Sequence, residues 1–98
     1  MDFSFSPESS YEANYDDILS VTRSLRRRRC RTHHKGVSIV HDYDQNGVNA
    51  YVRNGCCKEF SQTILKELGA SECFDYIVLE NCEGFAPAVR FAVEYRVR

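Results

Sequence analysis

The sequence lacks the features that mark several large classes of protein. No apolar run approaches the ~18 residues that a membrane span needs, so we expect no transmembrane helix. The first residues have neither a basic start nor an apolar middle, so we expect no signal peptide. A glycine-rich phosphate loop, a Gly-x-Ser-x-Gly motif and paired carboxylates at a catalytic spacing are also missing. We therefore expect an intracellular protein without a common catalytic motif.

The cysteines also lack a familiar arrangement. The five are Cys30, Cys56, Cys57, Cys73 and Cys82, and none forms a Cys-x-x-Cys pair. An odd number in a chain with no secretory signal favours reduced thiols, packed as small hydrophobic groups. Cys30 lies close to His33 and His34, but no spaced second half of a zinc finger follows. Adjacent Cys56 and Cys57 cannot easily direct both sulfurs at one ion, so we expect no metal site and no cofactor.

Length and composition favour one small globular domain. The chain has 98 residues, of which 43% are hydrophobic, enough for a modest core but too short for two domains. The net charge of −1 conceals an asymmetry. Residues 1–20 carry five acids and no base, whereas residues 23–31 (RSLRRRRCR) carry six arginines and no acid. The average charge therefore argues against a generally basic protein, but it is compatible with a local basic site at residues 23–31.

Hydrophobic spacing predicts an α+β fold with the order α-β-β-α-β-β. Period-two and helical patterns, together with turn residues, divide the chain into elements. The predicted elements are a flexible tail (1–9), a helix (10–25) with a Ser9–Glu12 capping box, strands 36–41 and 48–53 flanking Asn46–Gly47, a helix (57–68) ended by Gly69, and strands 76–80 and 89–97. We expect one domain over residues 10–98, with two hairpins forming an antiparallel sheet and both helices on one face.

The arginine-rich segment is the first candidate site. Guanidinium groups form forked contacts with phosphates and carboxylates, and a cluster of them makes a salt-sensitive binding site. The candidate binding residues are Arg23, Arg26, Arg27, Arg28, Arg29 and Arg31. We expect a small non-enzymatic interaction or regulatory protein that binds an acidic partner, either nucleic acid or protein. A viral or mobile-element accessory protein fits this description, located in the cytoplasm or, through the basic run, in the nucleus. The alternative is a solvated helix end that balances the acidic first helix.

Two short segments indicate a second possible function. Residues 34–40 (HKGVSIV) and 81–86 (NCEGFA) resemble the H-box and NC box of the lecithin:retinol acyltransferase-like family, which includes picornaviral proteins. The resemblance implies Cys82 as nucleophile and His34 as base of a thiol acyltransferase or hydrolase, or an inactive relative. A thiolate is the reactive form, and a nearby histidine lowers its pKa or accepts its proton. A packed cysteine and a histidine with satisfied hydrogen bonds are the alternative.

The last predicted strand is a third candidate. Apolar and polar residues alternate over 89–97, which predicts one buried and one exposed face. If one side of this strand is unpaired, its backbone is open to another strand. We therefore expect a possible homodimer contact through residues 89–97.

Overall fold

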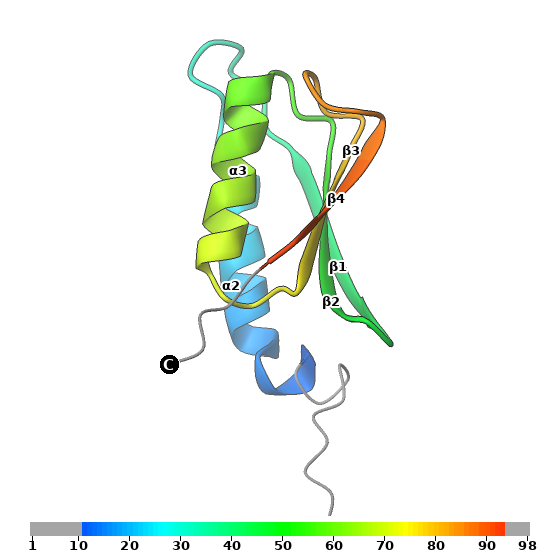
Figure 1. Ribbon diagram of the computed structural model, residues 1–98. Helices are drawn as coiled ribbons and strands as arrows, with labels where there is room; N and C mark the ends of the chain where they lie inside the picture. The colour runs from blue at the N-terminus through cyan, green and yellow to red at the C-terminus, as the bar shows by residue number, and fades with distance from the viewer. Residues whose placement is uncertain (1–10, 94–98) are drawn as a thin grey trace, which may run out of the picture.

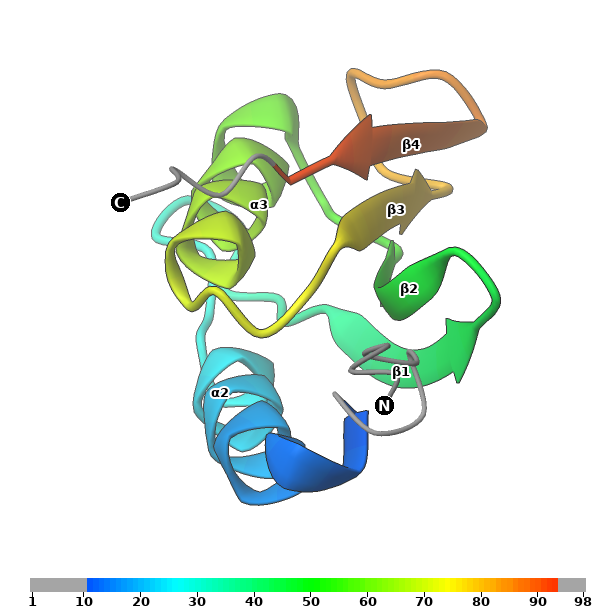
Figure 2. The ribbon, with the colours of Figure 1, turned by 60° about the horizontal axis from the view of Figure 1, so that its bottom comes forward.

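The computed structural model describes residues 11–93 (Figure 1). The predicted tail and the last part of the predicted final strand therefore lie outside the described residues. The elements are α2 (Tyr15–Arg26), β1 (Ser38–Asp44), β2 (Gly47–Arg53), α3 (Lys58–Ala70), β3 (Tyr76–Glu80) and β4 (Ala88–Ala92). Figure 2 shows both helices on the same side of one curved sheet. The predicted order of elements and the predicted placement of the helices are confirmed.

The first helix is amphipathic, as its sequence predicts. Ile18, Thr22 and Leu25 are buried, and their spacing of three and four residues places them on one face. Residues 11–13 are also helical, but a turn at Asn14 separates them from α2. The predicted helix is therefore interrupted once, and the Ser9 half of its predicted capping box lies outside the described residues.

The hairpin predicted from Asn46–Gly47 is present, but its turn consists of Gln45 and Asn46, and Gly47 is the first residue of β2. The two strands pair antiparallel from Ser38 opposite Arg53 to Asp44 opposite Gly47. The Asp44 carboxylate accepts a hydrogen bond of 2.8 Å from the Asn46 backbone amide, which closes the turn. Gly47 has φ +145°, a conformation that side chains disfavour. The local sequence of this turn thus determines the register of the hairpin.

The sheet is mixed, so the predicted antiparallel sheet was wrong at its centre. Its strand order is β1-β2-β3-β4, with antiparallel outer pairs. The central pair is parallel, running from Asn49 opposite Tyr76 to Arg53 opposite Glu80. The physical reason is the connection: α3 carries the chain back along the sheet after β2, so β3 starts at the same end as β2.

The second helix extends past its predicted end. Gly69 was expected just beyond the helix, but α3 continues to Ala70. The Ser71 hydroxyl donates a 2.6 Å hydrogen bond to the Leu68 carbonyl, which satisfies one of the last helical oxygens. The left-handed conformation after the helix belongs to Glu72, with φ +58°. Side-chain capping therefore replaces the glycine stop that the sequence predicted.

The core lies between the helices and one face of the sheet. Its fully buried large side chains include Ile18, Ile39, Ile64, Leu68, Phe74, Ile77 and Leu79. The opposite sheet face is polar and internally paired. There Asp42 accepts hydrogen bonds from the Asn49 amide (2.9 Å) and the Tyr51 hydroxyl (3.2 Å), and the Arg90 guanidinium lies 3.7 Å from the Tyr76 ring centroid. Within residues 11–93, neither helix has the length and apolarity required to cross a bilayer.

Candidate functional site

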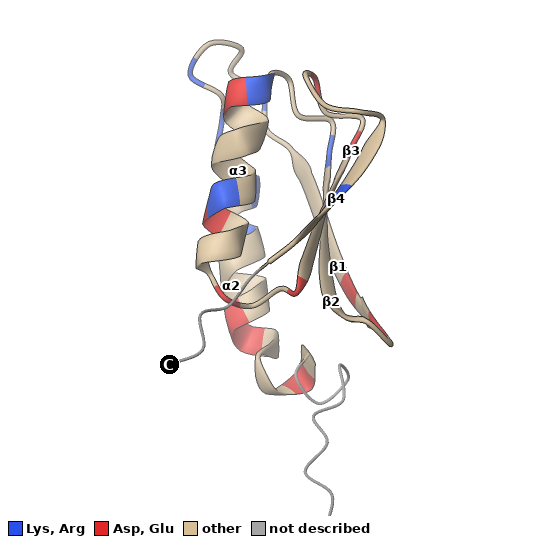
Figure 3. Cartoon of the chain, in the orientation of Figure 1, with Lys and Arg blue, Asp and Glu red and all other residues tan. Residues whose placement is uncertain are grey.

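The arginine-rich segment forms the end of α2 and the loop that follows it. Arg23 and Arg26 occupy the last turn of the helix, and Arg27 is its C-terminal cap. The loop then runs from residue 28 to residue 37 before β1 begins. In Figure 3 the start of α2 and the β1–β2 turn carry acidic residues, whereas basic residues lie towards the opposite end of the molecule. The predicted charge asymmetry is therefore also an asymmetry in space.

Three of the six arginines are used inside the fold. The Arg26 guanidinium donates two hydrogen bonds, of 3.0 and 2.7 Å, to the Ile39 carbonyl and thereby ties α2 to β1. Arg28 forms an ion pair with Glu67 of α3. Arg29 donates to the carbonyls of Arg26 (3.0 Å) and Arg28 (3.1 Å), which caps the helix end. These contacts hold the segment in place, but they leave fewer arginines for a partner than the sequence predicted.

The other three arginines, Arg23, Arg27 and Arg31, are exposed and have no hydrogen-bond or ion-pair partner within residues 11–93. Arg23 and Arg27 lie four residues apart, on the same side of α2. They line a pocket of about 450 Å³ together with Asp16. Arg31 lines a second pocket, of about 440 Å³, between the loop and the start of α3. The free basic groups therefore line two separate hollows, one along α2 and one between the loop and α3.

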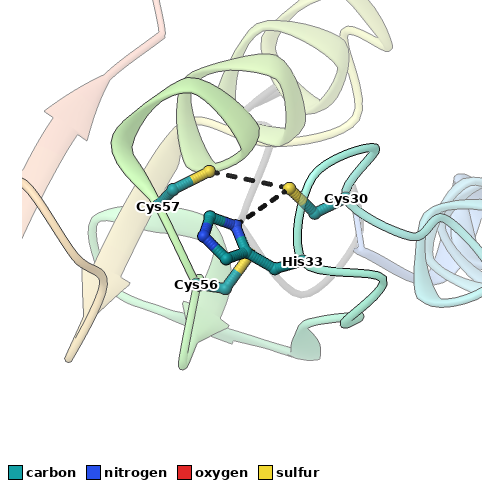
Figure 4. Close-up of side chains that lie close together, drawn as sticks. All are labelled: Cys30, His33, Cys56 and Cys57. Carbon is teal, nitrogen blue, oxygen red and sulfur yellow. Dashed lines mark hydrogen bonds between the residues drawn. The ribbon is translucent and has the colours of Figure 1, made fainter.

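A group of three cysteines and one histidine lies beside the second pocket. The donor atoms of Cys30, His33, Cys56 and Cys57 all lie within 4.8 Å of one another. The Cys30 sulfur is 3.4 Å from His33 Nδ1 and 3.7 Å from the Cys57 sulfur. Figure 4 shows these side chains converging between the arginine loop and the beginning of α3. The expectation that adjacent Cys56 and Cys57 cannot direct both sulfurs to one place was wrong.

Local backbone structure explains this convergence. The Cys30 amide donates to the Lys35 carbonyl (2.9 Å), and the His34 amide donates to the Cys30 carbonyl (2.8 Å), so residues 30–35 form a tight turn. His34 adopts φ +58° in this turn, and His33 is directed back towards Cys30. On the other side, Cys56 and Cys57 lie in a bend, with Cys57 extended at the N-cap of α3 (φ −158°, ψ 161°). The change of direction at this bend allows neighbouring sulfurs to face the same point.

The thiols of this cluster differ in acidity. Hydrogen bonds lower the pKa of Cys30 to about 6, although burial opposes the shift. The largest contribution comes from the backbone of His33, and the His33 side chain adds to it. Burial raises the pKa of Cys56 to about 11, and its hydrogen bonds to Cys30 and Cys57 act in the same direction. Cys30 therefore ionises before Cys56, and a thiolate is both a nucleophile and a metal ligand.

The predicted catalytic residues lie in different settings. Cys82 is only 4% exposed. Its sulfur accepts a 3.4 Å hydrogen bond from the Gly55 amide and lies 3.6 Å from the carbonyl oxygens of Val52 and Glu80. His34 is exposed in the arginine loop, and within residues 11–93 no hydrogen bond joins it to Cys82. The structure thus brings Cys82 together with backbone groups, and it brings His33 together with thiols.

Comparison of the chain with protein-family models, with curated proteins and with solved structures finds no match. The resemblance of residues 34–40 and 81–86 to the H-box/NC family therefore stays a prediction. The sequence analysis weighed Cys30, His33, Cys56 and Cys57 as metal ligands and expected no site. The available signal was the Cys30-x-x-His33 spacing, a common half of a zinc site, followed by a cysteine pair directly before a helix.

Proposed function

We propose that this protein is a non-enzymatic binding protein whose arginine-rich end recognises an acidic macromolecule. The observation that carries the proposal is the division of the six arginines into two sets. Arg26, Arg28 and Arg29 hold the segment against the fold, whereas Arg23, Arg27 and Arg31 are exposed and lack partners within residues 11–93. A guanidinium without an internal partner is available for phosphate or carboxylate groups.

The anchored arginines make the free ones more effective. Side chains that are already positioned lose less conformational entropy on binding than side chains on a flexible tail. Arg23 and Arg27 project from the ordered last turns of α2, and Arg31 belongs to the turn closed by hydrogen bonds between Cys30 and residues 34 and 35. The binding surface is therefore preorganised, which distinguishes it from a flexible basic tag.

The test compares two triple variants of equal net charge. Arg23→Gln/Arg27→Gln/Arg31→Gln removes the free arginines, and the control Lys35→Gln/Lys58→Gln/Lys66→Gln removes the three exposed lysines. Binding of a fluorescent single-stranded oligonucleotide and of a poly-glutamate peptide is measured by anisotropy at several salt concentrations. If the free arginines contact three phosphates, log K falls with log[salt] with a slope of about −2 for a single strand.

We expect the arginine variant to lose most of its affinity and its salt dependence, and the lysine variant to keep both. Preference for the oligonucleotide identifies nucleic acid as the partner class, and preference for the peptide identifies an acidic protein surface. Equal losses in the two variants, or binding that salt does not weaken, would refute the assignment to these three arginines.

The proposal for self-association concerns β4. This strand is at the edge of the described sheet and pairs only with β3 there, and an edge strand can accept another strand. We propose a homodimer through β4, the described part of the strand predicted over residues 89–97. Light scattering after size exclusion tests it. The antiparallel register with β3 turns the Ala92 amide away from that strand, so Ala92→Pro removes an edge amide and should shift a dimer to monomer. A wild-type chain that is monomeric at millimolar concentration contradicts it.

A further inference from the structure

The cluster of Cys30, His33, Cys56 and Cys57 has the dimensions of a zinc site. In a tetrahedral site with Zn–S bonds of about 2.3 Å and a Zn–N bond of about 2.05 Å, two sulfurs lie about 3.8 Å apart, and a sulfur and a nitrogen lie about 3.6 Å apart. The observed separations from the Cys30 sulfur are 3.7 Å to Cys57 and 3.4 Å to His33 Nδ1. All four donors lie within 4.8 Å of one another. We propose that these residues bind one Zn²⁺ ion.

The donor set favours zinc over other metals. Three thiolates and one imidazole form the Cys₃His combination found in structural zinc sites, and soft sulfur ligands disfavour magnesium and calcium. Four protein ligands complete a tetrahedron and leave no open position, so the ion is structural. On binding, each of the three thiols releases a proton to solvent as its sulfur donates a lone pair to the metal, and neither oxidation nor reduction takes place.

The surrounding charge suits the complex. Three thiolates, a neutral histidine and Zn²⁺ carry a net charge of −1. The charged residues that line the adjoining pocket are Arg28, Arg29, Arg31 and Glu59, so positive groups outnumber negative ones beside the negative complex. Cys30 itself is 4% exposed, which shields its bond to the metal from water.

A disulfide is the competing use of the same cysteines. The Cys30 and Cys57 sulfurs are 3.7 Å apart, whereas a disulfide requires about 2.05 Å. Such a bond would also leave His33 and Cys56 without a role, although their donor atoms lie within the same 4.8 Å group. The four-residue arrangement is therefore explained better by an ion at its centre than by a bond between two of its members.

The ion would connect two segments that are distant in sequence. Cys30 and His33 belong to the turn after α2, whereas Cys56 and Cys57 lead into α3. Metal binding adds its free energy to folding when the unfolded chain has no preformed site. We therefore expect zinc to fix the loop that carries Arg31, although the site itself does not depend on what the arginines bind.

The experiment measures zinc content and metal geometry in the full chain, purified under reducing conditions. We expect one zinc per chain by native mass spectrometry and elemental analysis. Replacement by Co²⁺ should produce thiolate-to-cobalt charge-transfer bands and the intense visible bands of a tetrahedral site. A strong zinc chelator should remove the metal and lower the melting temperature.

Two pairs of variants assign the site. His33→Asn removes a ligand whose side chain is exposed and is expected to leave the fold intact. The matched control His34→Asn changes the adjacent histidine, and asparagine tolerates its positive φ. Cys30→Ser removes a sulfur ligand, and Cys73→Ser, outside the cluster, is its control. Changing a residue that only hydrogen-bonds a metal ligand reduces metal affinity about 10–100-fold. We therefore expect a larger loss of affinity for each ligand variant and no change for either control.

Three outcomes would overturn the inference. The first is folded wild-type protein with less than a tenth of an equivalent of zinc after reconstitution. The second is full zinc content in both single variants, His33→Asn and Cys30→Ser. The third is a titration, in denaturant without reductant, that finds three free thiols in place of five, because a disulfide would then occupy the cluster. None of these measurements involves an acidic partner, so failure here is distinct from failure of the proposed binding function.

Discussion

Gly55 is the position at which a single added methyl group should be most damaging. A Cβ atom at Gly55 would lie 2.0 Å from the Ser61 hydroxyl oxygen, 3.1 Å from the Cys82 sulfur and 3.2 Å from the Ser61 Cβ. Favourable contacts between heavy atoms occur near 3.5–4.0 Å. Ser61 is fully buried in the first turns of α3, so its side chain cannot turn away into solvent. We therefore expect Gly55→Ala to displace the start of α3 from the sheet.

The magnitude follows from the overlap. Overpacking a core by one methyl group costs roughly 1–3 kcal/mol, and an approach of 2.0 Å to a buried atom points to the upper end, about 3 kcal/mol. For a domain of this size, each kcal/mol shifts the melting temperature by about 4–8 °C. Gly55→Ala should therefore melt at least about 12 °C below wild type.

A double-mutant cycle tests the cause. The Ser61 hydroxyl is buried and has no hydrogen-bond partner among the described residues, so Ser61→Ala alone should be neutral or stabilising by up to about 1 kcal/mol. In Gly55→Ala/Ser61→Ala the 2.0 Å contact is gone, and we expect recovery of about half of the lost stability, measured by urea unfolding. The control is Gly69→Ala. Apart from its chain neighbours and the nearby backbone of α3, no atom lies within 4 Å of its added Cβ, and it should stabilise by about 0.4–1 kcal/mol. A Gly55→Ala protein that melts within 2 °C of wild type, or no coupling with Ser61, would refute the reasoning.

Three further predictions concern charge and thiol chemistry. Burial lowers the pKa of His41 below 6.5, so the contribution of neutral His41 to stability is present above pH ~6.5 and is lost as the pH falls through the folded-state pKa. The urea midpoints measured at pH 8 and pH 5 should therefore differ more for wild type than for His41→Asn. Equal differences in the two proteins would contradict the lowered pKa. Glu67→Gln should lower the free energy of unfolding by less than about 1 kcal/mol, because the ion pair of Glu67 with Arg28 is partly exposed. The same variant should bind polyanions more tightly, since it releases Arg28 as a fourth free arginine. Unchanged affinity would show that Arg28 is not accessible to a partner. Buried Cys82 should react with iodoacetamide no faster than half-buried Cys73, although burial also raises the pKa of Cys73. Peptide mass spectrometry measures the two reactions. Selective alkylation of Cys82 below pH 7 would instead support the thiol enzyme that residues 34–40 and 81–86 suggest.

Local patterns in the sequence determined the elements of this fold. Asn46–Gly47 identified the first hairpin, because a backbone conformation that glycine adopts readily is needed there. The spacing of Ile18, Thr22 and Leu25 identified the buried face of α2. These predictions succeeded because each depends on interactions between residues that are near in sequence. Gly69 shows the limit of such reasoning: the Ser71 hydroxyl bonds the end of α3 and lets the helix continue through the glycine.

Tertiary structure alone decided how those elements meet. The parallel pairing of β2 and β3 follows from the path of α3 across the sheet, which residue periodicity does not encode. The division of the arginines depends on distant partners, such as Ile39 for Arg26 and Glu67 for Arg28. The same is true of the thiols: Cys30 and Cys57 are separated by 26 intervening residues, yet their sulfurs lie 3.7 Å apart. Contacts of this kind arise only when the chain has folded, because no local preference brings their members together.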